Sequence, residues 1–486
     1  MMTQVDKKAL SISLMIGMIY SLPLILWGGF YIDDMARALG GQTGWSVNGR
    51  PLADLTFNIL NFFTINADSS PMPQLMACVI MSYVMFVTWR RFIPSSGSYG
   101  VIFTSPIFLS PLFLANLSFK YDAITMAASV LLCVLPFTLS IKNRIITLAL
   151  NISLIIASLS LYQASISVYI VYATICFLIS TEKNSVIKLV IDALTLAVGY
   201  ALYSYFIASK YVTGEYNLKH SVIISPTTPN FLEVFQSNLS SFYKILEFAF
   251  KGWYAVTLIV SLILFVMSFI LILANTIAKR HFIKIPFIAG SIPVLLFCCI
   301  GPVLFLKEPL FSPRVMIGFG ATILAITVVS VNFLPLIRKT IFSVLLVQVF
   351  SCTMLAYTYA NTLKFQHEYE KNITTQIITD LYINELQGID NFIVNGVIWT
   401  SPQGLISTKK YPIIRYLIPR LVIEDSPWGM TRFLHSGINL RYAPAEVRSK
   451  ALKHMCSLRL IKKSNFYNIY KMDRTAIIDM KRSCNK

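Results

Sequence analysis

Charged residues are scarce in this sequence of 486 residues, at 13% of the chain, whereas 56% of the residues are hydrophobic. The mean hydropathy is +0.66. A soluble globular domain carries about 25% charged residues, so this composition excludes the water-soluble class. Acidic residues are scarcer still, 22 against 41 basic ones, which gives a formal net charge of +19. The composition therefore indicates a basic protein that is embedded in a membrane.

The sequence also lacks repeats and metal motifs. Since no internal repeat or low-complexity tract is present, a two-fold transporter architecture has no support. The five histidines and eight cysteines show no recognisable metal-ligand spacing, so no metal site and no cofactor is predicted, although metal dependence stays open. Six cysteines fall in or beside apolar stretches, where a thiol behaves as a small apolar group. Whether the remaining pair, Cys456 and Cys484, is bonded is left open.

Long apolar stretches dominate the first 360 residues. A helix needs about 20 residues to cross a bilayer, and the sequence predicts about eleven such spans. The first follows Lys7 and Lys8 but is too long for a signal peptide, so we expect it to be an anchor. The spans lie near 10–30, 72–89, 98–116, 123–141, 145–161, 165–180, 186–207, 254–277, 285–305, 315–336 and 341–360.

Basic residues gather on one side of the predicted spans. With the N-terminus in the cytoplasm, the only acidic residues on the inner side are Asp6 and Glu182, and the loops between spans on the other side are charge-balanced. This is the positive-inside pattern, and it fixes the expected orientation. It also accounts for much of the net charge, so no nucleic-acid partner is predicted. The inner basic residues are Lys7, Lys8, Arg90, Arg91, Lys142, Arg144, Lys183, Lys188, Lys279, Arg280, Lys284, Arg338 and Lys339.

We predict two domains. Residues 1–360 form a transmembrane domain with long outer loops at 31–71 and 208–253, and residues 361–486 form an outer α/β domain. In the outer domain we expect a helix at 366–386, a strand at 391–398 and a helix that begins near Pro444. Strands at 457–461 and 466–472 are expected to form a hairpin. The basic excess of this domain fits either a solvated surface or binding to anionic lipid or glycan phosphate.

Asp33 and Asp34 directly follow the first span and are the leading catalytic candidates. Adjacent carboxylates at an interface disfavour each other's ionisation, and partial desolvation raises the pKa of at least one of them, which suits a general base. In a helix, Asp33 and Arg37 lie on one face, four residues apart, while Asp34 points aside. The alternative, that both aspartates only cap a helix N-terminus, stays open.

The same loop continues with Gly44-Trp45 and Gly49-Arg50-Pro51, followed by an apolar stretch at 55–63. We expect this stretch to lie along the interface as a short amphipathic helix, with Trp45 at headgroup level and Arg50 at phosphate depth.

This order of motifs resembles the serotype-converting O-antigen glucosyltransferases of Gram-negative bacteria and their phages, most closely the type II member. The resemblance covers the whole chain in length and layout, is strongest over 31–52, and is weaker at 116–122, 161–164 and 307–314. It implies a polytopic α-helical membrane protein of GT-C-like architecture, with about eleven transmembrane helices and a C-terminal periplasmic α/β domain, in the bacterial inner membrane.

The resemblance also implies an activity. The donor would be undecaprenyl-phosphate-glucose, and the acceptor a sugar hydroxyl of a lipid-linked O-antigen repeat of lipopolysaccharide on the periplasmic side. The transfer, which converts the serotype, would invert the anomeric centre with an aspartate as general base. The implied partners are the donor lipid, the acceptor, membrane lipid, and a separate donor synthase and flippase.

An inverting transfer needs a base and cations that hold the departing phosphate. Asp33 or Asp34 would be the base, and arginine suits the phosphate because it binds in bidentate fashion. The candidate phosphate-binding residues are Arg37, Arg50, Lys120, Lys307 and Arg314, and the candidate acceptor- or sugar-binding residues are Trp45, Asp122, Tyr162, Gln163 and Glu308. The alternatives are that Lys120 only snorkels, that Tyr162 belongs to an aromatic belt, and that Asp122 and Glu308 pair with Lys120 and Lys307.

Two other classes handle lipid-linked glycans. An O-antigen ligase or polymerase is not expected to place paired carboxylates directly after its first span. A lipid-linked glycan flippase is expected to line a central cavity with charge, whereas here the charge lies mostly at the ends of the spans. The acceptor sugar, its hydroxyl and the linkage configuration are not encoded in any pattern that we recognise.

Overall fold

The computed structural model describes residues 2–227, 229–384, 388–424, 426 and 428–484. Contacts within the chain divide it into two compact units. Unit 1 comprises Met1–Gly28 and Thr43–Thr358, and unit 2 comprises Gly29–Gln42 and Tyr359–Lys486. The segment that carries the paired aspartates therefore belongs to unit 2 by its contacts, although the first apolar span immediately precedes it.

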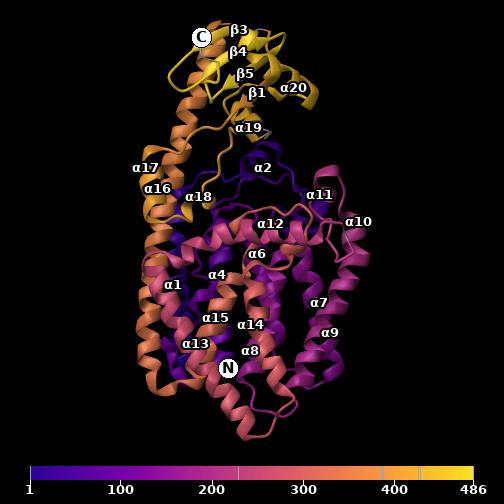
Figure 1. Cartoon of the computed structure of the whole chain (residues 1–486), viewed down its shortest axis with the longest axis vertical. Coiled ribbons are helices and arrows are strands. Elements are labelled where there is room, and N and C mark those ends of the chain that lie inside the picture. Colours follow the sequence, from indigo (N-terminus) through magenta and orange to yellow (C-terminus); the bar gives the residue numbers. More distant parts are fainter. Residues whose placement is uncertain (1, 228, 385–387, 425, 427, 485–486) are drawn as a thin grey trace. The chain divides into compact units, whose positions relative to one another are not determined.

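Unit 1 is built from helices, most of which run side by side (Figure 1). Its α-helices are α1 (Gln4–Trp27), α3 (Pro51–Leu60), α4 (Met72–Phe92), α5 (Leu114–Ser118), α6 (Ala123–Thr138), α7 (Arg144–Leu161), α8 (Ile166–Ile179), α9 (Ser185–Tyr203), α10 (Ser209–Tyr211), α11 (Glu215–Lys219), α12 (Phe231–Leu246), α13 (Gly252–Ala278), α14 (Lys284–Ile300), α15 (Gly318–Phe333) and the first part of α16 (Arg338–Asn384). The 3₁₀ segments η1 (Ser46–Asn48), η3 (Ser98–Ile107) and η8 (Pro313–Val315) connect them. Helix α12 runs across the other helices (Figure 1).

Within the described residues, six helices are long and apolar enough to cross a membrane. Four shorter apolar helices, of 10 to 17 residues, accompany them. Together they account for every predicted span except the one at 98–116, and they identify the chain as a membrane protein. Eleven crossings remain a prediction. The six long helices are Gln4–Trp27, Met72–Phe92, Arg144–Leu161, Ser185–Tyr211, Gly252–Ala278 and Pro335–Ile383, and the four shorter ones are Ala123–Thr138, Gln163–Ile179, Lys284–Ile300 and Gly318–Phe333.

The stretch at 98–116 is not one continuous helix. It forms η3, a turn, and then the short α5. Pro106 and Pro111 lie at this break, where proline removes a backbone donor and clashes with the preceding turn. All residues from 100 to 127 are buried, and irregular backbone at membrane depth is tolerated where protein surrounds it.

Small residues allow close helix packing around α1. Gly17 lies so close to α4 and η3 that a Cβ atom there would meet Ser82 Oγ at 2.3 Å and the ring of Phe108 at 2.9 Å. In addition, Tyr20 donates a hydrogen bond from its hydroxyl to Ser110 O at 2.8 Å. Small residues at helix contacts are typical of membrane proteins, where van der Waals packing drives association.

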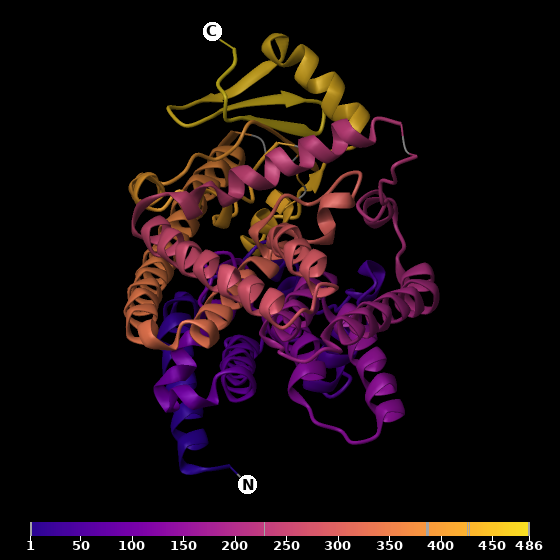
Figure 2. The ribbon, with the colours of Figure 1, turned by 60° about the horizontal axis from the view of Figure 1, so that its bottom comes forward.

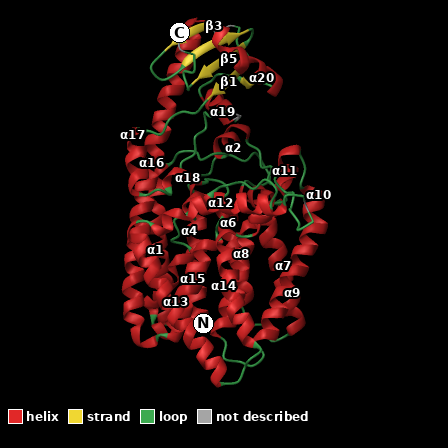
Figure 3. Cartoon of the chain, viewed as in Figure 1, coloured by secondary structure: helices red, strands yellow, loops and turns green. Residues whose placement is uncertain are grey.

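Unit 2 contains a five-stranded sheet in the order β2-β1-β5-β4-β3. Figure 3 shows these strands in the C-terminal part of the chain. The strands are β1 (Asn391–Asn395), β2 (Arg441–Tyr442), β3 (Arg459–Lys463), β4 (Asn468–Met472) and β5 (Thr475–Asp479). Strand β1 pairs in parallel with β2 and β5, while β5–β4 and β4–β3 are antiparallel. The other elements of this unit are α2 (Asp34–Gly40), α17 (Pro402–Lys410), α18 (Ile414–Leu417), α19 (Trp428–His435), α20 (Ala445–His454) and the C-terminal part of α16.

Helices cover both faces of this sheet. On one face, Leu381 of α16 and Phe433 of α19 pack with Ile478 of β5. On the other, Ala451 of α20 packs with Ile477, and α20 lies along the sheet in Figure 2. The expected hairpin is present as β3–β4, the helix after Pro444 as α20, and Cys456 is disulfide-bonded to Cys484. The part of the predicted helix at 385–386 lies outside the described residues.

Candidate functional site

The Gly49-Arg50-Pro51 motif positions the Arg50 side chain within unit 1. Gly49 ends η1 with a φ of 75°, a left-handed conformation that favours glycine. A Cβ atom there would also meet the Tyr203 hydroxyl oxygen at 2.7 Å. Arg50 is the N-cap residue of α3, and Pro51 occupies the first helical position, where proline is preorganised for a helix. Gly49 therefore forms the turn, Arg50 follows it as the cation at the N-cap, and Pro51 begins helix α3.

Three side chains contact Arg50, those of Asp122, Tyr162 and Gln163. Together with Arg50 and with Trp45, which binds Asp122, they form what we call the Arg50 cluster. Arg50 Nη1 lies 3.6 Å from Asp122 Oδ1, and Arg50 Nε donates to Gln163 Oε1 at 3.2 Å. The Arg50 guanidinium carbon stands 4.7 Å from the centre of the Tyr162 ring. Burial lowers the pKa of Arg50, whereas Tyr162 and Asp122 act to raise it. The side chain keeps 20% of its surface exposed, so it is fixed on one side and accessible on the other.

The Trp45 side chain is completely buried within the protein. Its expected place at headgroup level stays a prediction. The indole Nε1 donates to Asp122 Oδ1 at 2.7 Å, and the ring stacks on Phe57 at a centroid distance of 4.6 Å. Asp54 Oδ1 accepts the backbone N–H groups of Gly44 and Trp45, both at 2.8 Å. In this conformation Trp45 offers no ring face to a sugar and instead holds Asp122 in place.

Gln163 connects the cluster to two further elements. Its Nε2 donates to Asn48 O at 2.8 Å and to the Tyr203 hydroxyl at 2.9 Å. Tyr203, at the end of α9, in turn donates to Gly49 O at 2.8 Å. Sequence reasoning missed Tyr203, because a tyrosine at the end of an apolar span looks like any belt tyrosine.

Arg314 lies near the cluster. Its backbone oxygen accepts hydrogen bonds from the Tyr162 hydroxyl at 3.1 Å and from Asn116 Nδ2 at 3.0 Å. Its guanidinium stands 5.1 Å from the centre of the Phe119 ring. Arg314 also contributes to the lowered pKa of Arg50, because two like charges repel. Two of the five predicted phosphate-binding cations therefore lie close enough to influence each other.

Lys120, Lys307 and Glu308 lie in other surroundings. Lys120 is only 7% exposed, which argues against a snorkelling side chain, and its Nζ donates to Ser70 Oγ at 3.0 Å and lies 3.9 Å from Asp68 Oδ2. Glu308 forms an ion pair with Lys219 at 3.0 Å. Lys307 and Glu308 line an open pocket of about 480 Å³, together with His220, Glu233, Val234, Ser237, Asn238, Pro309 and Phe311.

Asp33 and Asp34 lie in unit 2, where they begin α2 as expected. Asp33 is the N-cap residue, and its backbone oxygen accepts from Arg37 N at 3.1 Å. Asp34 is completely buried, and its Oδ2 accepts from Tyr31 N at 3.0 Å. Asp33 is partly exposed. The preceding Ile32 has a φ of 44°, an unfavourable conformation for a β-branched residue that is typically retained at functional sites.

The C-terminal part of the chain holds this aspartate segment. Tyr31 donates from its hydroxyl to Leu417 O at 2.8 Å. Phe30 and His435 form an edge-to-face ring pair at 6.5 Å, and α2 packs on α19. These contacts join residues nearly 400 positions apart, and no sequence pattern predicts them.

A buried ionic group lies in the same unit, beyond the apolar part of α16. Glu370 Oε2 is 3.7 Å from Arg432 Nη2, and Glu370 Oε1 accepts from Leu421 N at 3.3 Å. Arg432 Nη2 also lies 3.0 Å from His367 Nδ1. Burial raises the pKa of Glu370 to about 7, against the opposing attraction of Arg432.

Among the described residues, no group of three or more His, Cys, Asp or Glu side chains is arranged to hold a metal ion.

Comparisons with known proteins give two matches. A family model for glucosyl transferase GtrII matches residues 22–325. A protein of Salmonella phage P22, described as an uncharacterised 55.3 kDa protein in the gtrB 5′ region, is 32% identical over 450 residues, which cover 87% of this chain and 89% of the phage protein. No solved structure matches the chain.

Proposed function

The chain belongs to the glucosyl transferase GtrII family, and on this premise we propose that it transfers glucose from undecaprenyl-phosphate-glucose to a sugar hydroxyl of the O-antigen repeat. The observation that carries the proposal is the extent of the family match. Residues 22–325 include both aspartates, the whole Arg50 cluster and Arg314. The chain is thus a glycosyltransferase, and the donor, the acceptor and the residue roles are our proposals.

Asp33 is the proposed general base. It is partly exposed, whereas Asp34 is fully buried and accepts a hydrogen bond from Tyr31 N. In the proposed step, Asp33 takes the proton of the acceptor hydroxyl while that oxygen bonds to the anomeric carbon of glucose. The bond from this carbon to the phosphate oxygen breaks, and the electron pair leaves with undecaprenyl phosphate. Asp34 is a positioning residue that fixes the start of α2.

Arg50 and Arg314 are the proposed phosphate-binding pair. The donor phosphodiester already carries one negative charge and the leaving phosphate gains a second, and preorganised cations stabilise the developing charge more than they stabilise the ground state. Arg50 is held by Asp122, Gln163 and Tyr162 but stays partly exposed. Lys120 is a weaker candidate because Ser70 and Asp68 already engage its ammonium group. Arg37, Lys307 and the sugar-binding roles of Asp122, Tyr162, Gln163 and Glu308 remain predictions.

We place unit 2 and the reaction on the periplasmic side of the bacterial inner membrane. The basic residues at the predicted cytoplasmic ends of the helices support this orientation through the positive-inside rule. The disulfide between Cys456 and Cys484 also supports it, because such bonds persist in oxidising compartments. The proposed partners are the donor lipid, the lipid-linked acceptor, and a separate donor synthase and flippase.

Measuring the rate of glucose transfer in membranes that contain the donor and the O-antigen acceptor tests the proposal. A general base contributes about 10²–10⁴-fold, so we expect Asp33→Asn to lose at least 100-fold of the rate while Asp34→Asn keeps part of it. Asp473→Asn, on an exposed turn of unit 2, is the matched control and should keep full activity. Full activity of Asp33→Asn would disprove the base assignment. Joining of O-antigen chains, or lipid movement without glucose transfer, would instead indicate a ligase or a flippase.

A further inference from the structure

Helix α17 is attached to α16 just beyond the apolar part of that helix. Gln366 of α16 accepts a hydrogen bond from Ser401 N at 2.8 Å and donates one to Trp399 O at 3.1 Å. A Cβ atom at Gly404 would meet Thr362 Cγ2 at 3.5 Å, and Figure 1 shows the two helices side by side. The predicted span of α16 ends at 360, and Thr362 lies roughly 3 Å further along the helix axis. We therefore expect α17 to lie at the membrane surface.

The exposed face of α17 combines apolar and basic side chains. Leu405 is 53% exposed and Ile406 is 70% exposed. Lys409 and Lys410 follow them at a spacing of four residues, so each lysine lies beside one of these apolar side chains on the helix surface. Trp399, just before the helix, adds an indole that is 65% exposed. Lysine, tryptophan and aliphatic side chains on one surface are typical of segments that lie in a membrane interface.

The cations of this region lack carboxylate partners. The segment 396–423 contains Lys409, Lys410, Arg415 and Arg420 but no acidic residue. Arg420 attracts the buried Glu370, whereas no ion pair among the described residues joins the other three cations to a carboxylate. On the adjoining part of α16, the exposed acid at 368 is matched by an exposed lysine at 364, one helical turn away. The surface around α17 therefore carries excess positive charge.

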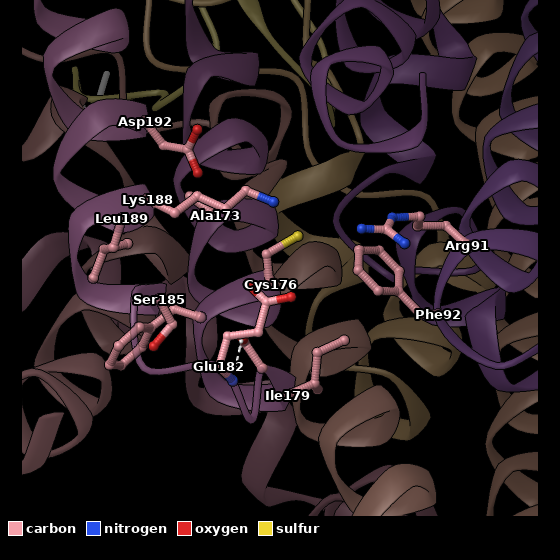
Figure 4. Close-up of a pocket in the computed structure, with 12 residues that line it drawn as sticks. Arg91, Phe92, Ala173, Cys176, Ile179, Glu182, Ser185, Lys188, Leu189 and Asp192 are labelled. Atoms are coloured by element: carbon pink, nitrogen blue, oxygen red, sulfur yellow. Dashed lines mark hydrogen bonds between the residues drawn. The ribbon is translucent and has the colours of Figure 1, made fainter. Parts of the chain in front are cut away.

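Cations that line a cavity in unit 1 are different in this respect. Figure 4 shows Arg91 and Lys188 pointing toward one another, but Glu182 and Asp192 line the same cavity of about 180 Å³. Asp192 attracts Lys188 one helical turn away. The contrast favours α17 over this cavity as a binding surface for anions.

We infer that α17 and Trp399 bind the surface of a membrane that contains anionic phospholipid, such as phosphatidylglycerol. The side chains of Leu405 and Ile406 insert between the acyl chains near the headgroups. The ammonium groups of Lys409 and Lys410 reach the lipid phosphates, because lysine stems can lie along apolar surface while the charge stays at the headgroups. This contact continues the lipid-facing surface of α16 and does not depend on the proposed glucose transfer.

Amide hydrogen exchange of the purified full chain in nanodiscs measures this contact without donor or acceptor. The peptide 402–410 should exchange more slowly in nanodiscs that contain phosphatidylglycerol than in nanodiscs of phosphatidylcholine alone. A lysine near an anionic surface contributes about 1 kcal/mol, so two lysines correspond to a slowing of up to roughly 30-fold. Added salt should reduce the difference because it screens the charges. Heparin, a soluble acidic polysaccharide, should have little effect in phosphatidylcholine nanodiscs.

Two double variants separate the parts of the contact. Lys409→Gln/Lys410→Gln should remove the difference between the two lipid compositions, since it removes both ammonium groups. Leu405→Gln/Ile406→Gln should speed exchange in both compositions, since it removes the inserted side chains. Thermal unfolding of each variant in detergent checks that it is folded.

A matched control removes the same charge from another helix. Lys450→Gln/Lys453→Gln, at exposed positions of α20, should leave exchange of 402–410 as in the parent. Equal exchange of the parent peptide in both lipid compositions would overturn the anionic lipid. A difference that persists without Lys409 and Lys410 would overturn the role of these lysines, and unchanged exchange in the Leu405/Ile406 variant would overturn insertion. Equal slowing by heparin would show that the surface binds acidic glycan instead.

Discussion

Arg50 is the residue whose surroundings bear most directly on catalysis. Three side chains from two separate segments fix its guanidinium, yet 20% of the side chain stays exposed. A planar, forked cation in such a setting matches a phosphate group better than the ammonium of lysine does.

We therefore expect Arg50→Lys to retain the fold and to lose much of the transfer activity. Loss of a charge-assisted hydrogen bond costs about 1.5–3 kcal/mol, which corresponds to roughly 10- to 100-fold in rate at subsaturating donor. Arg441→Lys, at an exposed position of unit 2, is the control and should transfer glucose at the parental rate. A parental rate in Arg50→Lys would remove Arg50 from the phosphate-binding pair.

Glu370 predicts a pH dependence of stability. Burial raises its pKa from an ordinary 4.5 to about 7, so the folded chain holds a proton that the unfolded chain has already released. The stabilisation is complete below about pH 4.5 and is lost as the pH rises through 7. A shift of this size corresponds to about 3 kcal/mol.

Glu370→Gln mimics the protonated carboxyl at every pH. The melting temperature of the variant, relative to that of the parent, should therefore rise between pH 5 and pH 7.5, whatever constant offset the substitution introduces. Glu368→Gln, an exposed neighbour on the same helix, should show no such trend. A difference between Glu370→Gln and the parent that does not change with pH would contradict the raised pKa.

Local sequence predicted some of these residues well and others poorly. The short helix that follows Ile32, in which Asp33 and Arg37 are four residues apart, depends on neighbours within a few positions, so the pattern sufficed. The burial of Trp45 depends on Asp122 and Phe57 from other elements. Residue type alone carries no information about such a partner.

At the scale of elements, hydropathy located the apolar helices because each must cover its backbone within lipid. The stretch at 98–116 was the exception, since its hydropathy is that of a span but its prolines break the helix. Full burial by the neighbouring helices permits the break, and hydropathy does not distinguish burial in protein from exposure to lipid.

Trp45 joins η1 to the start of α6 through Asp122, which predicts the effect of Trp45→Phe. The phenyl ring keeps the stacking on Phe57 but removes the indole hydrogen bond to the buried Asp122 Oδ1, at a cost of about 1–3 kcal/mol. We expect the melting temperature in detergent to fall by roughly 2–8 °C. Trp253→Phe, on an indole that is 73% exposed, should leave it unchanged, and an equal fall in both variants would show that the hydrogen bond is unimportant.

At the scale of the whole molecule, the proposed orientation predicts opposite accessibility for two exposed positions, 183 and 473. A membrane-impermeant maleimide, applied to cells with a permeable outer membrane, should label Asp473→Cys at once. It should label Lys183→Cys only after the inner membrane is opened. The parent chain, treated in the same way, gives the background labelling of its own cysteines. Immediate labelling of Lys183→Cys would contradict the proposed orientation.

The discontinuity of unit 2 has a consequence for how members of this family can exchange parts. The aspartate segment at 29–42 and the chain from 359 onward form one packing unit through Tyr31, Leu417 and the α2–α19 contact. A crossover that replaces only the C-terminal segment loses the matched contacts between that segment and residues 29–42. A hybrid that inherits both segments from the same relative keeps those contacts. Recombination between relatives should therefore conserve the pairing of these two distant segments, as if they were a single genetic module.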